Sequence, residues 1–213
     1  PIKVIISVLK SFGIINKFKP DVVIGFGGYA SSAMLYAASL KKLPTLIHEQ
    51  NSYAGITNKI LKDKVNKICV AYDHMEKFFP ANKLVKTGNP IWQDLMDVSS
   101  KRNEAFDFFK LDSAKKTVLV IGGSLGARTI NESIFDGLDK LKNANINLIW
   151  QTGKNFDKAN KIQHPTFNIQ HFIYEMDLAY AAADVVISRA GALSIAELAQ
   201  VAKPVILVPS PNV

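Results

Sequence analysis

Short apolar segments alternate with amphipathic segments along most of the chain. Apolar segments of strand length occur at 21–25, 44–47, 67–71, 84–87, 117–121, 146–151, 167–171, 184–188 and 205–208. Between them, apolar residues recur at helical spacing at 2–18, 31–40, 56–61, 130–141, 176–182 and 194–201. Apolar strands that alternate with helices are typical of parallel sheets covered by helices on both faces. The pattern therefore predicts an α/β fold with two Rossmann-like, doubly wound parallel-sheet domains.

The segment 93–116 interrupts this pattern, because it is polar, charged and only weakly periodic. We expect an interdomain linker region there. Residues 1–92 would form part of an N-terminal domain, and residues 117–213 a C-terminal domain. The chain begins at Pro1 and stops just after an apolar segment. We therefore expect a piece of a longer protein, with the N-terminal domain incomplete and the C-terminal domain truncated.

Composition narrows the function classes. The single cysteine, Cys69, excludes a disulfide framework and a multi-cysteine metal site, and it fits a reducing compartment such as the cytoplasm. No apolar run reaches the roughly 20 residues that cross a bilayer. The net charge of +8 favours an anionic partner, which could be a phosphate-bearing ligand, a membrane surface or a nucleic acid. Charge alone does not choose among these three.

The most informative motif is GGSLGAR at 122–128, which follows an apolar strand and opens a predicted helix. Glycines at such a corner let a ligand approach the backbone, and Ser124 could donate a hydrogen bond to an anion. The alternative is a purely structural turn between strand and helix. The motif does not match the dinucleotide fingerprint, and no acidic residue closes a second strand about 20 residues later, so a nicotinamide enzyme is disfavoured.

A second corner of this kind follows the apolar segment 184–188. Ala192, Leu193 and Ser194 would begin a helix whose N–H groups could face a phosphate, and Glu197 could accept from ribose hydroxyls. The alternative is a capping box, because Ser194 and Glu197 have its spacing. Two such corners suit a ligand with a diphosphate and a sugar, such as a nucleotide sugar.

In the first half, His48 and Glu49 lie where the apolar segment 44–47 ends. This edge of an open α/β sheet is where ligands bind. The two residues could perform acid/base chemistry or could anchor a loop. The sequence shows no metal-ligand cluster and no nucleophilic Ser/His/Asp or Cys/His set.

Several motifs, in this order, carry a resemblance to a known family. They are PDVV at 20–23 with GGY at 27–29, HEQN at 48–51 with AG at 54–55 and TNK at 57–59, TGNP at 87–90, GGSLGAR at 122–128, QTGK at 151–154 and SRAGALSIAE at 188–197. Over nearly its whole length, the chain resembles the MurG family of peptidoglycan glycosyltransferases, which add N-acetylglucosamine to lipid I.

The resemblance implies a GT-B fold, in which two Rossmann-like domains face a cleft. It implies an inverting transfer from UDP-N-acetylglucosamine (UDP-GlcNAc) without metal or cofactor, with the donor held mainly by the C-terminal domain. Ile173 would meet the uracil through its backbone, and Asn51 would reach the donor from the other domain. The other donor-binding residues implied are Ser124, Ala192, Leu193, Ser194, Ile195, Ala196 and Glu197. The acceptor-side residues implied are Gly27, Gly28, Tyr29, His48 and Glu49.

This chain departs from the family pattern at Trp92, where the family usually has an arginine that would contact the donor. The catalytic base proposed for the family lies upstream of Pro1, so no catalytic residue is assigned here. We expect the chain alone to lack full activity.

The family's acceptor, lipid I, implies a peripheral position on the cytoplasmic face of the bacterial inner membrane. The basic amphipathic segment 2–18 could rest on that anionic surface or could pack against a sheet. A different UDP-sugar enzyme of the same fold, an epimerase or a lipid glycosyltransferase, is the alternative function. Nucleic acid is not an expected partner despite the sequence pI of 9.4, because no known nucleic-acid-binding module is present.

Overall fold

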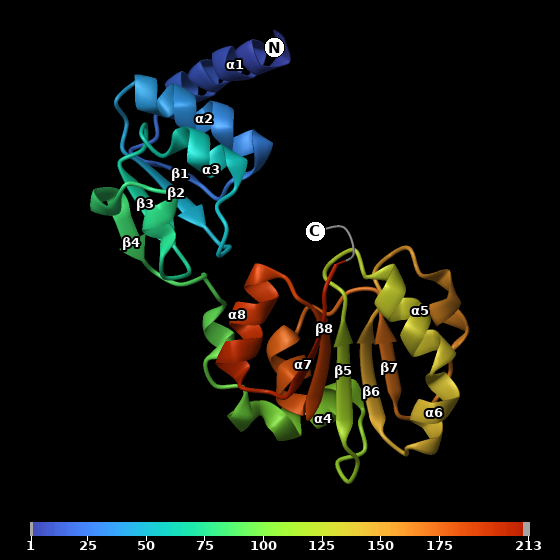
Figure 1. The fold of residues 1–213 in the computed structure, drawn as a ribbon. Helices are drawn as coiled ribbons and strands as arrows, with labels where there is room; N and C mark the ends of the chain where they lie inside the picture. Colours follow the sequence, from blue (N-terminus) through green and yellow to red (C-terminus); the bar gives the residue numbers. More distant parts are fainter. Residues whose placement is uncertain (1, 211–213) are drawn as a thin grey trace. The chain divides into compact units, whose positions relative to one another are not determined.

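The computed structural model describes residues 2–210. The chain divides into two compact units, Pro1–Pro90 and Ile91–Val213, and each is described by itself. Both units contain parallel strands joined by helices, as Figure 1 shows. The predicted α/β class with two parallel-sheet units is confirmed.

The first unit contains a four-stranded parallel sheet in the order β1-β2-β3-β4. Its strands are β1 (Val23–Gly25), β2 (Thr45–Glu49), β3 (Lys67–Val70) and β4 (Leu84–Lys86). Its helices are α1 (Ile2–Phe18), α2 (Gly28–Leu40) and α3 (Ile56–Leu61), with the short 3-10 helices η1 (Met75–Lys77) and η2 (Ala81–Lys83). Strand and helix alternate here as the apolar pattern predicted.

The helices of this unit pack on one face of its sheet. Leu35 of α2 and Leu61 of α3 form a buried cluster with Ile47 and Ile68 of the central strands. On the opposite face, Ile24 remains 53% exposed and Val85 41% exposed. The prediction of helices on both faces therefore differs from the described part of the first unit, where one face is covered.

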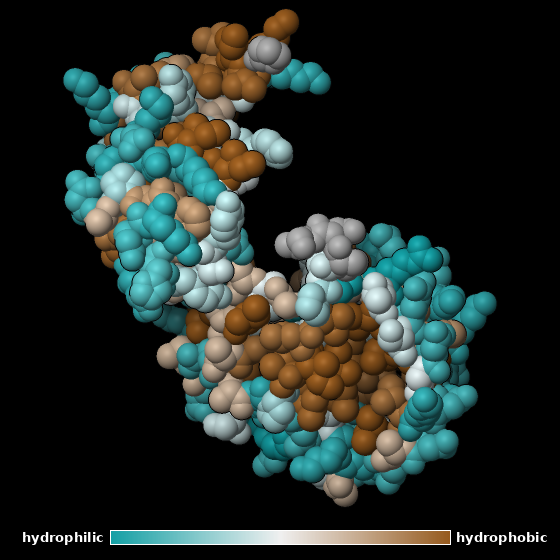
Figure 2. All heavy atoms as spheres, in the orientation of Figure 1, coloured by the Kyte–Doolittle hydropathy of each residue, from teal (hydrophilic) through white to brown (hydrophobic). Residues whose placement is uncertain are grey.

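Helix α1 packs with its Ile15 side and exposes the other side. Ile15 belongs to the core of the unit and is 3% exposed. The side chains of α1 that remain largely exposed are Ile2, Val4, Ile5, Ile6, Leu9, Ile14 and Phe18. Figure 2 shows apolar side chains gathered over this helix. The geometry of the helix is thus compatible with both predicted roles of segment 2–18, packing against a sheet and contact with a membrane surface.

The second unit contains a five-stranded parallel sheet in the order β7-β6-β5-β8-β9. Its strands are β5 (Thr117–Ile121), β6 (Asn147–Gln151), β7 (Phe167–Gln170), β8 (Val185–Arg189) and β9 (Val205–Val208). Its helices are α4 (Arg102–Phe109), α5 (Arg128–Asp136), α6 (Leu138–Asn143), α7 (Met176–Ala182) and α8 (Ala192–Val201), with the 3-10 helices η3 (Gln93–Leu95), η4 (Ser99–Lys101) and η5 (Asp157–Lys161).

Both faces of this second sheet are covered, as a doubly wound sheet requires. Leu119 and Ile121 of β5 join a core with residues of α4, α7 and α8. Val120, between them, joins a different core with Ile130 and Ile134 of α5. Since successive strand residues point to opposite faces, this alternation places helices on both sides of β5.

The segment 93–116, expected to be a linker, contains helix α4 and belongs to the second unit. Phe109 is 2% exposed and packs in the core beside α7. Arg102 donates to the carbonyl oxygens of Ala181 and Ala182 at 3.2 and 3.1 Å and to both carboxylate oxygens of Asp184 at 3.2 Å. Part of the segment that suggested a linker is thus a helix packed on the core of the second unit.

The single helix expected at 130–141 is two helices, because the helix is interrupted at Gly137, which lies between α5 and α6. Within residues 2–210, no helix combines the length and the apolar character that crossing a bilayer requires.

Candidate functional site

Two strand-to-helix corners leave the same edge of the second sheet. Strands β5 and β8 are parallel neighbours, and their last paired residues are Ile121 and Ser188. The loop after β5 leads into α5, and the loop after β8 leads into α8. The carboxyl edge of an open parallel sheet is where such folds bind ligands, so both predicted motifs lie at a position suited to binding.

The first corner is held rigidly by close contact between two backbones. Gly126 has φ +75°, and a Cβ there would lie 2.0 Å from the carbonyl oxygen of Thr152. Gly153 also has φ +75°, and its Cβ would lie 2.2 Å from the carbonyl oxygen of Leu125. Glycine is required at both positions, because an added carbon would overlap the facing loop. Ser124 is exposed on the loop that this contact fixes.

Gln151, the last residue of β6, ties this loop to Ile173. Its side-chain Nε2 donates to the carbonyl oxygen of Gly123 at 2.9 Å, and its Oε1 accepts from the backbone N–H of Ile173 at 2.9 Å. Of the two backbone polar groups of Ile173, the N–H is therefore occupied by Gln151. Gln151 belongs to the QTGK motif, but no role was predicted for it; its position as a glutamine at the end of an apolar strand is the signal that could have indicated one.

The second corner opens helix α8. The helix begins at Ala192, and its N-cap is Gly191, which itself makes no side-chain cap hydrogen bond. Ser194 lies inside the first turn, and the Glu197 carboxyl accepts from the hydroxyl of Tyr180. The capping-box alternative is therefore wrong, because it requires Ser194 at the N-cap.

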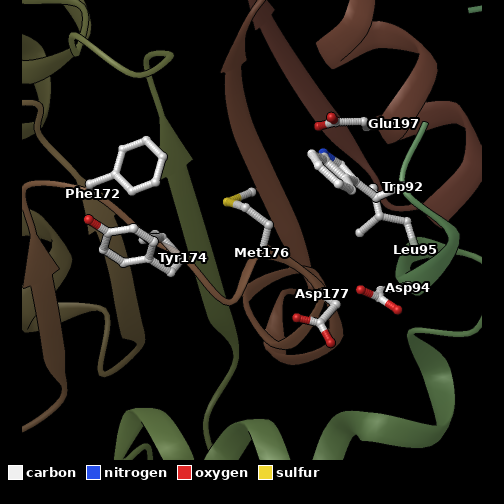
Figure 3. A pocket seen from close by; sticks show the side chains of 9 residues that line it. Trp92, Asp94, Leu95, Phe172, Tyr174, Met176, Asp177 and Glu197 are labelled. Atoms are coloured by element: carbon white, nitrogen blue, oxygen red, sulfur yellow. The ribbon is translucent and has the colours of Figure 1, made fainter. Parts of the chain in front are cut away.

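Glu197 lines a pocket of about 390 Å³ in the second unit. Figure 3 shows the side chains of Trp92 and Glu197 directed into the same space. The residues around this pocket are Trp92, Asp94, Leu95, Phe172, Ile173, Tyr174, Met176, Asp177 and Glu197. The structure thus brings together two predicted donor-binding residues, Ile173 and Glu197, with Trp92, which stands at the position of the family's donor-contacting arginine. Ser124 and residues 192–196 lie at the corners of the same sheet edge and are not part of this lining.

The pocket combines aromatic surface with a desolvated carboxyl group. Trp92 is 74% exposed and Tyr174 is 82% exposed, while Ile173, which also lines the pocket, is buried. Burial raises the pKa of Glu197 above its usual range, and the hydrogen bond from Tyr180 lowers that pKa in part. An aromatic surface beside a hydrogen-bond acceptor can bind a planar base and a hydroxylated sugar.

The first unit presents a glycine turn at the start of α2. The helix begins at Gly28, its N-cap is Gly27, and both glycines have positive φ, +74° and +82°. Tyr29 is 97% exposed. A pocket of about 400 Å³ is lined by Gly27, Gly28, Tyr29, Glu49, Asn51, Asn58 and neighbouring residues. Most of the predicted acceptor-side residues therefore surround one cavity.

Glu49 fastens the loop that follows β2. Its Oε1 accepts from the backbone N–H and side-chain Nδ2 of Asn51 at 3.1 and 3.2 Å, and its Oε2 accepts from the Gly55 N–H and Asn58 Nδ2, both at 2.9 Å. Glu49 is 2% exposed. Of the two roles left open for this residue, the structure favours the loop anchor, because both oxygens already accept from protein donors.

His48 is buried beside this network. Its Nε2 lies 2.9 Å from the carbonyl oxygen of Gly88, and its ring lies 5.6 Å from that of Phe26. It is not part of the lining of the pocket that contains Glu49. Among residues 2–210, no group of three or more His, Cys, Asp or Glu side chains could hold a metal ion.

Comparison with protein families matches two domain models to this chain. The glycosyltransferase family 28 N-terminal domain matches residues 1–70, and the glycosyltransferase family 28 C-terminal domain matches residues 117–213.

Curated relatives match the chain from end to end. One from Flavobacterium psychrophilum is 57% identical over 100% of this chain, and one from Parabacteroides distasonis is 53% identical over 100%. Both are named UDP-N-acetylglucosamine–N-acetylmuramyl-(pentapeptide) pyrophosphoryl-undecaprenol N-acetylglucosamine transferase. The chain spans 59% and 60% of the length of these relatives.

Solved structures share the fold. The crystal structure of Acinetobacter baumannii MurG has a TM-score of 0.69 and 31% identity over 100% of this chain and 59% of its own. A UDP-GlcNAc 2-epimerase from Neisseria meningitidis, bound to UDP-GlcNAc, has a TM-score of 0.71 over 94% of this chain and 62% of its own, with 14% identity. At that identity the second likeness concerns the fold alone.

Proposed function

This chain belongs to glycosyltransferase family 28, and on that premise we propose that it forms part of an enzyme that transfers N-acetylglucosamine from UDP-GlcNAc to lipid I. The names of relatives at 53–57% identity support the donor and the lipid-linked acceptor. They also favour a transferase over the epimerases, whose likeness to this chain is one of fold.

The observation that carries the proposal is the position of Glu197 at a pocket with an aromatic rim. A carboxylate can accept from both hydroxyls of a ribose, because each of its oxygens offers two acceptor sites. The exposed rings of Trp92 and Tyr174 offer surface to the uracil. The second unit thus offers a partner to each half of the uridine in the proposed donor: aromatic rings for the uracil and a carboxylate for the ribose hydroxyls.

The start of helix α8 supplies the diphosphate site in this proposal. The helix has ten residues, follows the corner after β8, and has Gly191 as its N-cap. The N–H groups of Leu193 and Ser194 lie in its first turn, where the helix dipole favours negative charge by about 0.3–1 kcal/mol. Ser124, exposed on the neighbouring corner, is the proposed additional donor to the phosphates.

The proposed transfer inverts the anomeric carbon of N-acetylglucosamine. The acceptor hydroxyl oxygen attacks that carbon while the bond from the carbon to the diphosphate oxygen breaks, and UDP leaves. The proton of the acceptor hydroxyl passes to a general base. Helix-start N–H groups stabilise the charge that develops on the leaving diphosphate. The base is not assigned to any residue of this chain.

The glycine turn of the first unit is the proposed acceptor side. Gly27 and Gly28 open helix α2, which has thirteen residues, beside a pocket of about 400 Å³. Backbone exposed at a glycine turn suits the diphosphate of a lipid-linked sugar. Asn51, held by Glu49 in this pocket's wall, is the proposed contact from the first unit to the donor.

We also propose that the exposed side of α1 rests on the cytoplasmic face of an anionic membrane, where a lipid-linked acceptor is found. This side combines apolar residues with Lys3, Lys10 and Lys17. Apolar side chains that enter a headgroup region and lysines near anionic lipids both favour such contact. Each lysine contributes on the order of 1 kcal/mol to the free energy of binding.

Calorimetry tests the donor proposal. We expect the chain to bind UDP-GlcNAc and UDP, to bind UDP-glucose more weakly, and not to bind a single-stranded oligonucleotide. Glu197→Ala should weaken UDP binding about tenfold or more, because it removes the charged acceptor of the ribose hydroxyls.

Glu104→Ala is the matched control, since Glu104 is exposed on α4 and does not line the pocket. Its affinity for UDP should equal that of the unaltered chain. Tighter binding of the oligonucleotide than of UDP-GlcNAc would contradict the transferase proposal, and equal affinity for the two sugar nucleotides would contradict the choice of N-acetylglucosamine.

Flotation with vesicles tests the membrane proposal. We expect binding to vesicles that contain phosphatidylglycerol and little binding to phosphatidylcholine alone. The double change Ile5→Asp and Leu9→Asp should abolish flotation, because both side chains are exposed and anionic groups oppose the surface. Met96→Asp, at a 63% exposed position of the second unit, is the control. Equal flotation of all three proteins would refute the proposal.

A further inference from the structure

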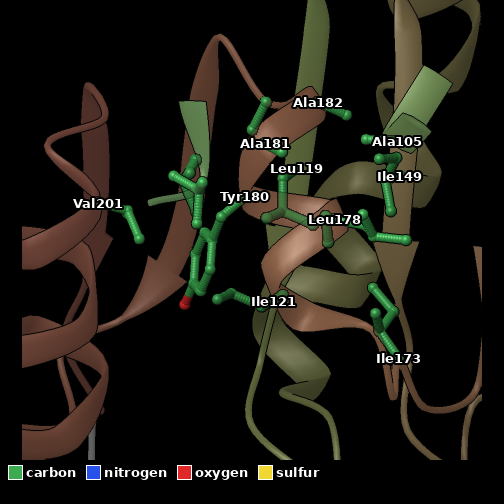
Figure 4. Close-up of a cluster of buried hydrophobic side chains, with 14 of the residues drawn as sticks. Ala105, Leu119, Ile121, Ile149, Ile173, Leu178, Tyr180, Ala181, Ala182 and Val201 are labelled. Carbon is green, nitrogen blue, oxygen red and sulfur yellow. The ribbon is translucent and has the colours of Figure 1, made fainter. Parts of the chain in front are cut away.

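A buried tyrosine lies behind the carboxyl group that faces the pocket. Tyr180 of α7 is 0% exposed, and its ring belongs to the core of the second unit. Figure 4 shows this ring among aliphatic side chains, with Ile121 and Val201 among its neighbours. Its hydroxyl donates to Oε2 of Glu197 at 3.2 Å. We propose that Tyr180 is a positioning residue, which holds the Glu197 carboxylate in the orientation that accepts the ribose hydroxyls of a nucleoside diphosphate.

This inference rests on the proposed function, because it assigns the orienting contact of the same donor site. Glu197 is half-buried on α8, and Tyr180 lies on a different helix, 17 residues earlier. A tyrosine ring fixed by core packing has little rotational freedom, so its hydroxyl is a fixed point from which the longer glutamate side chain can be held. The hydrogen bond therefore transmits the rigidity of the core to the pocket wall.

The contact leaves the carboxylate able to bind a ligand. Tyr180 reaches one oxygen, Oε2, whereas a carboxylate has about four acceptor sites. Two hydroxyls of a ribose can therefore bind while the tyrosine remains in place. Glu49 of the first unit is different, because four donors reach its two oxygens.

The hydrogen bond also favours the ionised form of Glu197. Burial raises the pKa of this carboxyl, and donation from Tyr180 opposes the rise. Burial and the nearby carboxylate raise the pKa of the Tyr180 hydroxyl, so the tyrosine keeps its proton and remains a donor. The other charged groups at the pocket are Asp94 and Asp177, and Lys101 pairs with Asp177 at 2.6 Å.

The test is Tyr180→Phe, which removes the hydroxyl and keeps the ring. Calorimetry compares UDP with 2′,3′-dideoxy-UDP, which lacks the ribose hydroxyls. We expect the substitution to weaken UDP about threefold to tenfold and to leave the affinity for the dideoxy nucleotide unchanged. A tyrosine that only fills the core would change both affinities by the same factor, and that result would overturn the proposal.

A second readout does not depend on any ligand. Carboxyl carbon NMR follows the titration of Glu197, and Tyr180→Phe should raise its pKa, because an opposing hydrogen bond is lost. An unchanged pKa would overturn the link between Tyr180 and Glu197. Tyr36→Phe, at a half-buried tyrosine on α2, is the matched control and should change neither readout.

Together, the binding measurement and the pKa measurement distinguish the donor proposal from the proposal that Tyr180 positions Glu197. If the unaltered chain does not bind UDP but Tyr180→Phe still raises the pKa of Glu197, the donor proposal fails and the contact between the residues stands without its role in binding. If UDP binds normally and the substitution alters neither its affinity nor the pKa, the positioning role is refuted and the donor proposal is unaffected.

Discussion

The two units use a carboxyl group near the carboxyl edge of the sheet in opposite ways. In the first unit, Glu49 accepts from four protein donors and is 2% exposed. In the second, Glu197 accepts from Tyr180 and lines a pocket. An acidic residue near the carboxyl edge of a parallel sheet can therefore be a structural fastener or a ligand acceptor. The number of protein donors that reach its oxygens distinguishes the two.

The glycine turns of the two units also differ in how closely other atoms approach them. A Cβ at Gly27 would have its nearest neighbour, Asn58 Nδ2, at 3.7 Å, which is ordinary contact. A Cβ at Gly126 would lie 2.0 Å from a backbone oxygen. In the first unit, the side chain of Glu49 holds the loop after β2. In the second unit, the loop after β5 is held by backbone contact at glycines and by the side chain of Gln151.

Gly126→Ala should have the largest effect on stability. The substitution combines a left-handed φ of +75° with overlap against Thr152, and we expect a loss of about 4 kcal/mol in the free energy of unfolding of the second unit. Urea unfolding followed by circular dichroism measures it. Gly27→Ala, which has the strain without the overlap, should cost only about 1–3 kcal/mol in the first unit. Equal losses at the two glycines would remove this half of the comparison.

Glu49→Ala should come next, with a loss of about 3 kcal/mol in the first unit. The substitution leaves the Gly55 N–H and Asn58 Nδ2 without their acceptor, and each buried donor without a partner costs about 1–3 kcal/mol. Hydrogen exchange of the amides at 50–58 measures the loss. Glu76→Ala, at an exposed glutamate of the same unit, is the control. If protection of these amides were the same in both variants, Glu49 would not be a fastener.

Glu197→Gln should have the smallest effect on stability, and its sign should depend on pH. The folded-state pKa of Glu197 is raised, chiefly by burial, so the folded protein binds this proton more tightly than the unfolded chain does. The contribution of Glu197 to stability is therefore complete below its unfolded pKa and is lost as the pH rises through the higher folded pKa. Relative to Glu197→Gln, the unaltered chain should become less stable over that interval. Calorimetric melting at a series of pH values tests this, and a difference independent of pH would contradict it.

Continuous apolar segments made much of the fold predictable. The segments 117–121 and 205–208 were placed at their observed bounds, because β-branched residues end at turn residues there. Helix α4 was missed, because Ala105, Phe106 and Phe109 bury one side of an otherwise charged segment. Three buried apolar residues in a short helix, beside an exposed Phe108, give too weak a periodicity to outweigh the surrounding polar residues.

The candidate site was predictable in its backbone and not in its side-chain partners. Glycine-rich corners after apolar strands indicated where N–H groups gather. The partners of Gln151 and Tyr180 could not be inferred, because each contact joins elements that only the folded sheet brings together. For the same reason the sequence could not separate the two roles open to Glu49.

The two tryptophans of this chain lie in contrasting surroundings. Trp92 is 74% exposed at the pocket, whereas Trp150 is 0% exposed and donates to Asn131 at 3.1 Å. Indole emission shifts to shorter wavelength when water is excluded from the ring. A ligand that covers Trp92 would therefore shift the fluorescence emission of this indole to shorter wavelength, while the buried Trp150 provides a constant internal reference. The molecule thus carries an intrinsic optical probe of its own pocket, without any attached dye.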